Sequence, residues 1–470
     1  MACGLYLAFG EINTPDYAAP TLAALIAAGV VLHQVKYRWM SFVSIFTLTH
    51  VVAFPIGTLL VLSLSSPSLA IEPAVWRTTP LSLWAMVAGM AGLILGIVLA
   101  KVRLVSSSHD NYASQLHEVI LTPVWFNVGL VSLIVPLVLV YINSGIYYQK
   151  DVVGVDEYSF ANAASLGFTG YLAYVSYGGV VLQIRRYLRT RMKRDLHYAL
   201  FCFLLPTIVM LPSGSRANTL IICAIALLYF LQMEKRVGAK YLVFGVSLLL
   251  FFFLTISIAA YRISELSRGA TSFSERMTLA FGNIGSIETS DSRAVNEIVR
   301  AQLGRRLSDN VSVGYLLDII PETFPHRGFD GMLEFSYYLL PTAFRPDVSL
   351  DFNYDAALMM DKYQFRSEIG GSSPMLIIGE LYERFGWSGI VVGLACIGFV
   401  LARLDRWISA NTVKGTLMWA MLFYGVVNMY TYSLLKIFTL LTRQVVIFLI
   451  IVYLLERILY TFSKWKIKAT

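Results

Sequence analysis

Charged residues are scarce in this chain. Asp, Glu, Lys and Arg make up 14% of its 470 residues, and hydrophobic residues make up 57%. Together with a mean hydropathy of +0.65, this excludes a soluble domain of ordinary composition. The composition predicts an all-α polytopic membrane protein.

Several other features are missing, and each absence narrows the function. The four cysteines lie in or beside apolar runs, so we expect neither a disulfide framework nor a zinc site. No phosphate-binding loop is present, which argues against ATP as the energy source, and we expect no cofactor. Internal repeats, which are typical of transporters, are also missing. The first twenty residues lack a basic start and a continuous apolar stretch, so we expect no cleavable signal peptide.

Long apolar runs are abundant. A helix needs about 20 mostly apolar residues to cross a bilayer, and eleven runs come near or meet this requirement. They lie near residues 18–33, 40–64, 81–100, 122–142, 164–184, 198–212, 217–233, 241–261, 375–402, 416–434 and 438–459. The first run is short and could instead be re-entrant or interfacial, so the predicted count is about 11, with a range of 10–12.

Lysine and arginine are unevenly distributed between the connections. Most of them lie around Lys36, Lys101, 185–194, 235–240 and 403–414, and in the C-terminal tail. The short connections on the other side hold few, among them Arg77 and Lys150. The positive-inside rule makes the first set cytoplasmic. Most of the net charge of +8 then comes from the lysines and arginines that set the orientation in the membrane, and we expect no nucleic-acid partner.

Lysine is nearly absent from the one long segment without a membrane-crossing run, Arg262 to Pro374. This segment has ten Arg but only Lys362, together with fifteen Asp and Glu. The predicted division is 1–261 with helices one to eight, 262–374 as a large external loop, and 375–470 with helices nine to eleven and a cytoplasmic tail. Guanidinium groups bind phosphate in fixed bidentate geometry, so the loop could hold an anion. The alternative is a folded lid whose arginines pair with its own carboxylates.

Four arginines fall at the outer membrane face in this topology. Arg216 follows Gly214 in a tight turn and would sit in the first turn of the next helix, where a cation opposes the helix dipole unless an anion docks there. The alternative for Arg216 is contact with lipid head groups. The other three are predicted to lie on the same face. Arg262 follows the run that ends at 261, Arg345 precedes Pro346, and Arg443 lies near the start of the last run.

Other ionisable residues are candidates for proton transfer or binding. His326 is the only histidine in an outer segment. Glu380 lies near the membrane boundary and could face an external cavity, or it could pair with Arg384 four residues later. His50 lies inside an apolar run, where a hydrogen-bonded neutral imidazole is the simpler reading. A spacing of four residues between Asp347, Asp351 and Asp355 suits a cation only weakly, and we expect no metal.

Several motifs in residues 200–450 resemble a known family. They are "GSRAN" (214–218), "YLLPTAFRP" (338–346), "SSPMLIIGELYERFGWSGIVVG" (372–393), and "NM" (428–429) followed by "TRQVV" (442–446). In this order and spacing they resemble the Wzy-type polymerases of O-antigen and enterobacterial common antigen, which assemble bacterial surface polysaccharides and lipopolysaccharide. The first 200 residues resemble this family only in being apolar and helical.

The resemblance implies an inverting glycosyltransferase with a GT-C-like fold in the bacterial inner membrane, with its large loop in the periplasm. Its substrates would be undecaprenyl-pyrophosphate-linked oligosaccharides, and a chain-length regulator is a possible partner. Arginines at the outer face hold the pyrophosphate in this family. That role carries over best to Arg216 and Arg443 and less directly to Arg345, and Arg262 is a further candidate by position.

The chemistry also needs a group that deprotonates the acceptor hydroxyl, since the pyrophosphate is already an activated leaving group. The predicted candidates are Glu380, Glu334 and His326, in that order. Two alternatives remain open: a transporter that moves the same lipid-linked sugars across the membrane, and a ligase that transfers finished glycan to another acceptor.

Overall fold

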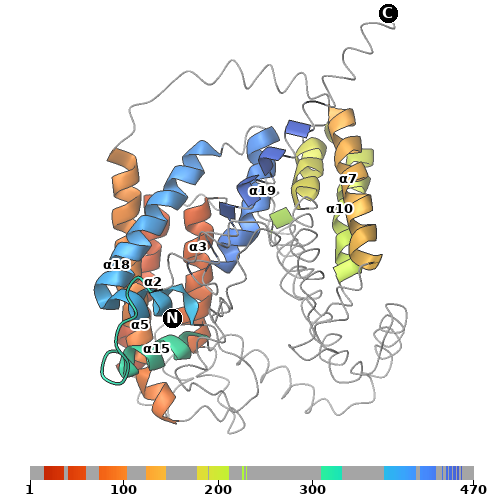
Figure 1. Cartoon of the computed structure of the whole chain (residues 1–470). Helices are drawn as coiled ribbons and strands as arrows, with labels where there is room; N and C mark the ends of the chain where they lie inside the picture. Colours follow the sequence, from red (N-terminus) through yellow and green to blue (C-terminus); the bar gives the residue numbers. More distant parts are fainter. Residues whose placement is uncertain are drawn as a thin grey trace, which may run out of the picture. The chain divides into compact units, whose positions relative to one another are not determined.

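The structure is a computed structural model of the whole chain (Figure 1). It describes residues 15–35, 41–59, 73–102, 123–143, 177–188, 190–210, 309–330, 375–408 and 413–429, and single residues at 225, 226, 229, 434, 437, 441, 442, 444–446, 448–450, 453, 454 and 457. Within these residues the regular structure is helical and no strand occurs. The prediction of an all-α chain is therefore confirmed for this part.

The described helices fall on the predicted apolar runs, except for one at 309–319, which lies inside the predicted loop 262–374. They are α2 (Pro15–Gln34), α3 (Phe42–Val51), the π-helix η1 (Val52–Ile56), α5 (Pro73–Val102), α7 (Pro123–Asn143), α10 (Lys193–Met210), α15 (Asp309–Ile319), α18 (Leu376–Trp407) and α19 (Val413–Asn428). Four spans in them are long and apolar enough to cross a membrane: Asp16–Gln34, Phe42–Leu59, Thr78–Ala100 and Leu376–Trp407. The runs at 164–184, 217–233, 241–261 and 438–459 lie wholly or in large part outside the described residues.

The first run, which could have been re-entrant, is a full helix of 20 residues, α2.

The chain groups into two compact units. The first contains Met1–Ser106, Ser292–Trp407 and Gly425–Thr442, and the second contains Ser107–Asp291, Ile408–Tyr424 and Arg443–Thr470. In the second unit, the Arg185 guanidinium donates to Thr416 Oγ1 at 2.9 Å, and Arg186 pairs with the buried Asp195 at 2.9 Å. Part of the basic run at 185–194 is thus tied into the fold.

The first unit is built on the packing of α5 against α18. A Cβ atom at Gly92 would collide with the carbonyl of Val391, and one at Gly96 would collide with the carbonyl of Ala395. The two glycines are four residues apart and therefore lie on one face of α5. Small residues at this spacing allow helix backbones to approach closely in membranes, where dispersion forces favour tight packing.

At one end of the first unit, Asp405 and Arg406 of α18 form hydrogen bonds to the ends of the neighbouring helices. The Asp405 carboxylate accepts the Phe42 backbone N–H at 2.6 Å and the Ser41 hydroxyl at 2.5 Å, so it caps the start of α3. The Arg406 guanidinium donates to the carbonyl of Ala100, near the end of α5, at 2.9 Å. Charge distribution predicts all three chain regions to lie on the cytoplasmic side.

The opposite end is covered by α15, which belongs to the predicted large loop and lies across the lower ends of the neighbouring helices in Figure 1. Asn310 Nδ2 donates to Thr58 Oγ1 at 2.6 Å, and Gly314 lies against the backbone of Thr78. Leu316 reaches Gly379 at the start of α18. Every one of these contacts joins segments predicted to lie on the same, outer side.

Candidate functional site

The α18 helix is broken at Gly386. This residue has φ 67° and ψ −157°, a combination essentially restricted to glycine, and it separates a short helix from a long one. The short helix folds back so that Leu381 lies against Gly389 and Gly393. The predicted run at 375–402 is therefore helical but not continuous, and the longer of its two helices begins at Trp387.

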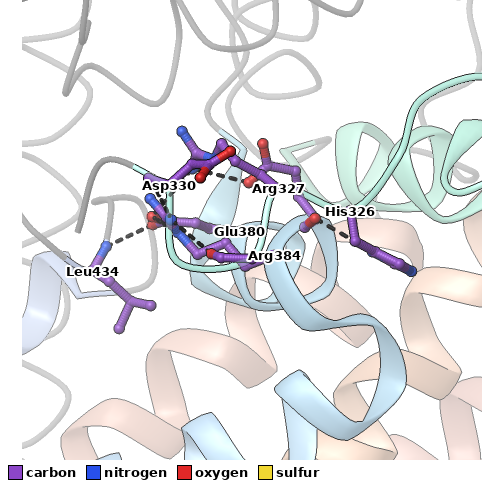
Figure 2. Close-up of polar contacts among 8 residues, drawn as sticks. His326, Arg327, Asp330, Glu380, Arg384 and Leu434 are labelled. Atoms are coloured by element: carbon purple, nitrogen blue, oxygen red, sulfur yellow. Dashed lines mark hydrogen bonds and ion pairs between the residues drawn. The ribbon is translucent and has the colours of Figure 1, made fainter. Parts of the chain in front are cut away.

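Four charged side chains on and beside the short helix form an Arg–Glu cluster (Figure 2): Glu380, Glu383 and Arg384, which are buried, and Arg327, which is 9% exposed. Arg384 Nε lies 3.0 Å from Glu380 Oε1, and Arg327 Nη2 lies 2.9 Å from Glu383 Oε2 and 3.7 Å from Glu380 Oε1. Two guanidinium groups balance two carboxylates. Charges this deeply buried are tolerated when they are paired and hydrogen-bonded.

Glu380 uses both carboxylate oxygens within the protein. Oε1 accepts from Arg384, which confirms the predicted pair between residues four apart, and Oε2 accepts the Leu434 backbone N–H at 2.6 Å. The side chain is 2% exposed. Glu380 therefore links the short helix to the chain near Leu434 and does not face an open cavity.

The loop after α15 is fixed to the short helix through the backbone as well. The N–H groups of Arg327 and Gly328 donate to the carbonyls of Glu383 and Arg384 at 3.0 and 2.9 Å. In return, Arg384 Nη1 donates to the carbonyls of Gly328 and Asp330 at 3.1 and 2.9 Å. One guanidinium thus holds both a carboxylate and a loop, which fixes the position of residues 326–330.

His326 projects from this fixed loop and is exposed (Figure 2). Its Nδ1 lies 3.3 Å from the carbonyl of Glu383, and its ring packs edge-on against Tyr382 with centroids 5.6 Å apart. A carbonyl can only accept, so this contact assigns the proton to Nδ1 and makes Nε2 the acceptor nitrogen. The imidazole is thus held at the break in α18 with Nε2 able to receive a proton.

His50, the other histidine singled out by the sequence, lies away from this cluster. It is fully buried between the rings of Phe46 and Phe54, and Nδ1 lies 2.8 Å from the carbonyl of Phe46. The hydrogen-bonded neutral form expected for it agrees with this geometry.

The remaining predicted site residues lie outside the described part of the chain. They are Glu334, Arg216, Arg262, Arg345 and Arg443, and the same holds for Asp347, Asp351 and Asp355. Their roles stay predictions. Within the described residues, no group of three His, Cys, Asp or Glu side chains is arranged to hold a metal ion.

Two members of the cluster, Arg327 and Glu383, were not predicted from the sequence. Arg327 follows His326 directly, and Glu383 lies three residues after Glu380, which places both carboxylates on one helical face. The two carboxylates need two cations, and Arg384 supplies only one. That imbalance was a signal that the loop should provide another.

Comparisons of the chain with protein-family models, with curated proteins and with solved structures find no match.

Proposed function

We propose that this protein polymerises undecaprenyl-pyrophosphate-linked oligosaccharide repeat units into a surface polysaccharide. In this proposal it is a GT-C-like inverting glycosyltransferase with about 11 helices in the bacterial inner membrane, and the large loop lies in the periplasm. The observation that carries the proposal is the placement of His326. An exposed imidazole is held beside the break in α18, and its Nδ1 contact to the Glu383 carbonyl leaves Nε2 as the acceptor nitrogen.

The proposed reaction needs one base and a set of cations. His326 Nε2 takes the proton of an acceptor hydroxyl, whose oxygen forms a bond to the anomeric carbon of the donor. The bond between that carbon and the pyrophosphate oxygen breaks, and its electron pair leaves with undecaprenyl pyrophosphate. Arg216 and Arg443, with Arg345 and Arg262 as further candidates, would bind the departing charge. The lipid carrier supplies the energy.

The geometry changes the order of the proposed bases. Glu380 stood first, but its two oxygens are engaged by Arg384 and Leu434. A carboxylate that is already bound at both oxygens is a poor acceptor for a substrate proton. His326 therefore moves to first place and Glu334 to second, and Glu380 becomes a residue that holds the loop in position.

The experiment is reconstitution of the purified protein in liposomes with undecaprenyl-pyrophosphate-linked repeat units and no nucleotide. A glycan ladder on a gel, lost in His326→Ala and retained in Glu322→Ala on the same exposed loop, is the expected result. Movement of the lipid-linked sugar across the bilayer without a ladder would favour a transporter. Single transfers to a different acceptor would favour a ligase.

A further inference from the structure

Two tryptophans mark the ends of the long segment of α18. Trp387, directly after the break, is 43% exposed, and Trp407, the last residue of the helix, is 64% exposed. The 20 residue steps between them correspond to about 30 Å of helix, which is the thickness of the hydrocarbon core. Exposed tryptophans at both ends of a crossing helix are typical of the two lipid interfaces. This spacing places the Gly386 break at the level of the head groups.

An exposed aromatic side chain lies beside this break. Phe329, in the loop held by Arg384, is 76% exposed, the highest value among large hydrophobic side chains in the described residues. Its ring packs edge-on against Phe385 with centroids 4.9 Å apart, and Phe385 is separated from Trp387 only by Gly386. Tyr382 in turn packs edge-on against Trp387. Phe329 and Trp387, which are exposed, and Phe385, which is partly exposed, form an aromatic patch, and the buried Tyr382 supports Trp387 from the protein interior.

The loop that carries Phe329 is fastened from behind, so its exposure is built into the fold. Arg384 donates to the carbonyls on both sides of Phe329, those of Gly328 and Asp330. The charges of the Arg–Glu cluster pair with one another, Arg327 with Glu383 and Arg384 with Glu380. An apolar ring held outward at the level of the head groups gains free energy by entering the lipid.

We propose that the aromatic patch is a lipid-contact surface, with Phe329 inserted at the boundary between head groups and acyl chains of the leaflet next to Trp387. The occupant is the bilayer itself. The proposal rests only on the helix spacing and on the exposure of Phe329, and it stands whatever reaction the protein catalyses. It fixes the loop, and with it His326, at the membrane surface.

The test is photocrosslinking of the full-length protein in phosphatidylethanolamine and phosphatidylglycerol vesicles. Phe329 is replaced by p-benzoylphenylalanine, which preserves the aromatic ring and leaves all native cysteines in place. The same residue at Glu322, exposed on the same loop, is the matched control. After irradiation, mass spectrometry should find a phospholipid adduct at position 329 several-fold more abundant than at position 322.

Equal and low yields of lipid adduct at both positions would overturn the proposal. A crosslink from 329 to a second copy of the chain, with no lipid adduct, would overturn it in favour of a self-association surface. A second measurement serves if the p-benzoylphenylalanine variant is produced in too low a yield. A bromine-labelled phospholipid quenches the fluorescence of tryptophans that it contacts. It should quench a larger share of the tryptophan fluorescence in Phe329→Trp than in the unsubstituted chain, and equal shares would contradict the lipid contact.

Discussion

The Arg–Glu cluster shows how one carboxylate can organise several chain segments. Glu380 receives contacts from Arg384, Arg327 and the Leu434 backbone, so its negative charge is compensated on three sides. Because these groups are buried, the removal of one charge leaves the others without their partner. The same carboxylate in water would contribute little. Burial therefore makes Glu380 important for the fold.

We predict that Glu380→Gln destabilises the protein by about 3–5 kcal/mol, as expected when one partner of a buried ion pair is removed. The measurement is the unfolding temperature of the purified protein in detergent. Asp330→Asn is the matched control, because the Asp330 side chain is exposed and the contacts to Arg384 and Arg327 use its backbone. An unchanged unfolding temperature for Glu380→Gln would return Glu380 to the list of catalytic candidates.

The predicted pyrophosphate ligands give a second test at the residue level. Arg216→Ala and Arg443→Ala should each abolish polymer in cells while the protein stays in the membrane. Arg→Lys at the same positions should recover little activity, because an ammonium cannot replace the bidentate guanidinium contact. Lys193→Ala, on the predicted inner side, should keep full activity. Full polymer from both Ala variants would remove the pyrophosphate assignment.

Residue roles were only partly predictable from the sequence. The pair between Glu380 and Arg384 follows from helical spacing, which is a local property. Arg327 joins them from a position more than fifty residues earlier in the chain, as the Arg327 to Glu380 and Glu383 contacts show. No local rule connects such distant positions. The order of the proposed bases depended on a second contact of this kind, the bond from the Leu434 backbone N–H to Glu380.

At the level of elements, the hydropathy of the sequence located the described helices outside the large loop but missed α15 and the break in α18. The residues around Gly386 are mostly apolar, so the hydropathy averaged over a window of sequence does not change at the break. The informative detail was a glycine directly after the charged turn that carries Glu383 and Arg384. Tertiary contacts from Leu381 to Gly389 and Gly393 then fix the fold-back.

We predict that Gly386→Ala destabilises the protein and reduces polymer formation. The new Cβ would require a conformation that costs about 1–3 kcal/mol for a residue other than glycine. It would also lie 3.3 Å from His326 Nε2 and press on the imidazole. Unfolding temperature and polymer yield are measured together. Gly29→Ala is the control, because a Cβ at Gly29 in α2 meets nothing within 4 Å, and this variant should match the unsubstituted protein in both.

At the level of the whole molecule, the charge distribution and the contacts of the first unit agree. Asp405, Ser41 and Ala100 meet at one end of the helices, and Thr58, Thr78 and α15 meet at the other. The distribution of lysine and arginine predicts the first group to lie on the cytoplasmic side and the second on the outer side. The contacts show which helix ends lie together, but only the charge distribution predicts which side of the membrane each set faces.

That direction can be measured, and the proposed function depends on it. We predict that a cysteine at Glu322, on the exposed loop after α15, reacts with a membrane-impermeant maleimide in cells whose outer membrane has been permeabilised. A cysteine at Lys193, exposed at the start of α10, should react only after the inner membrane is opened. The unsubstituted chain measures labelling of the native cysteines. The reverse pattern would place His326 and the α15 loop in the cytoplasm, where they could not act on lipid-linked sugars presented at the outer face.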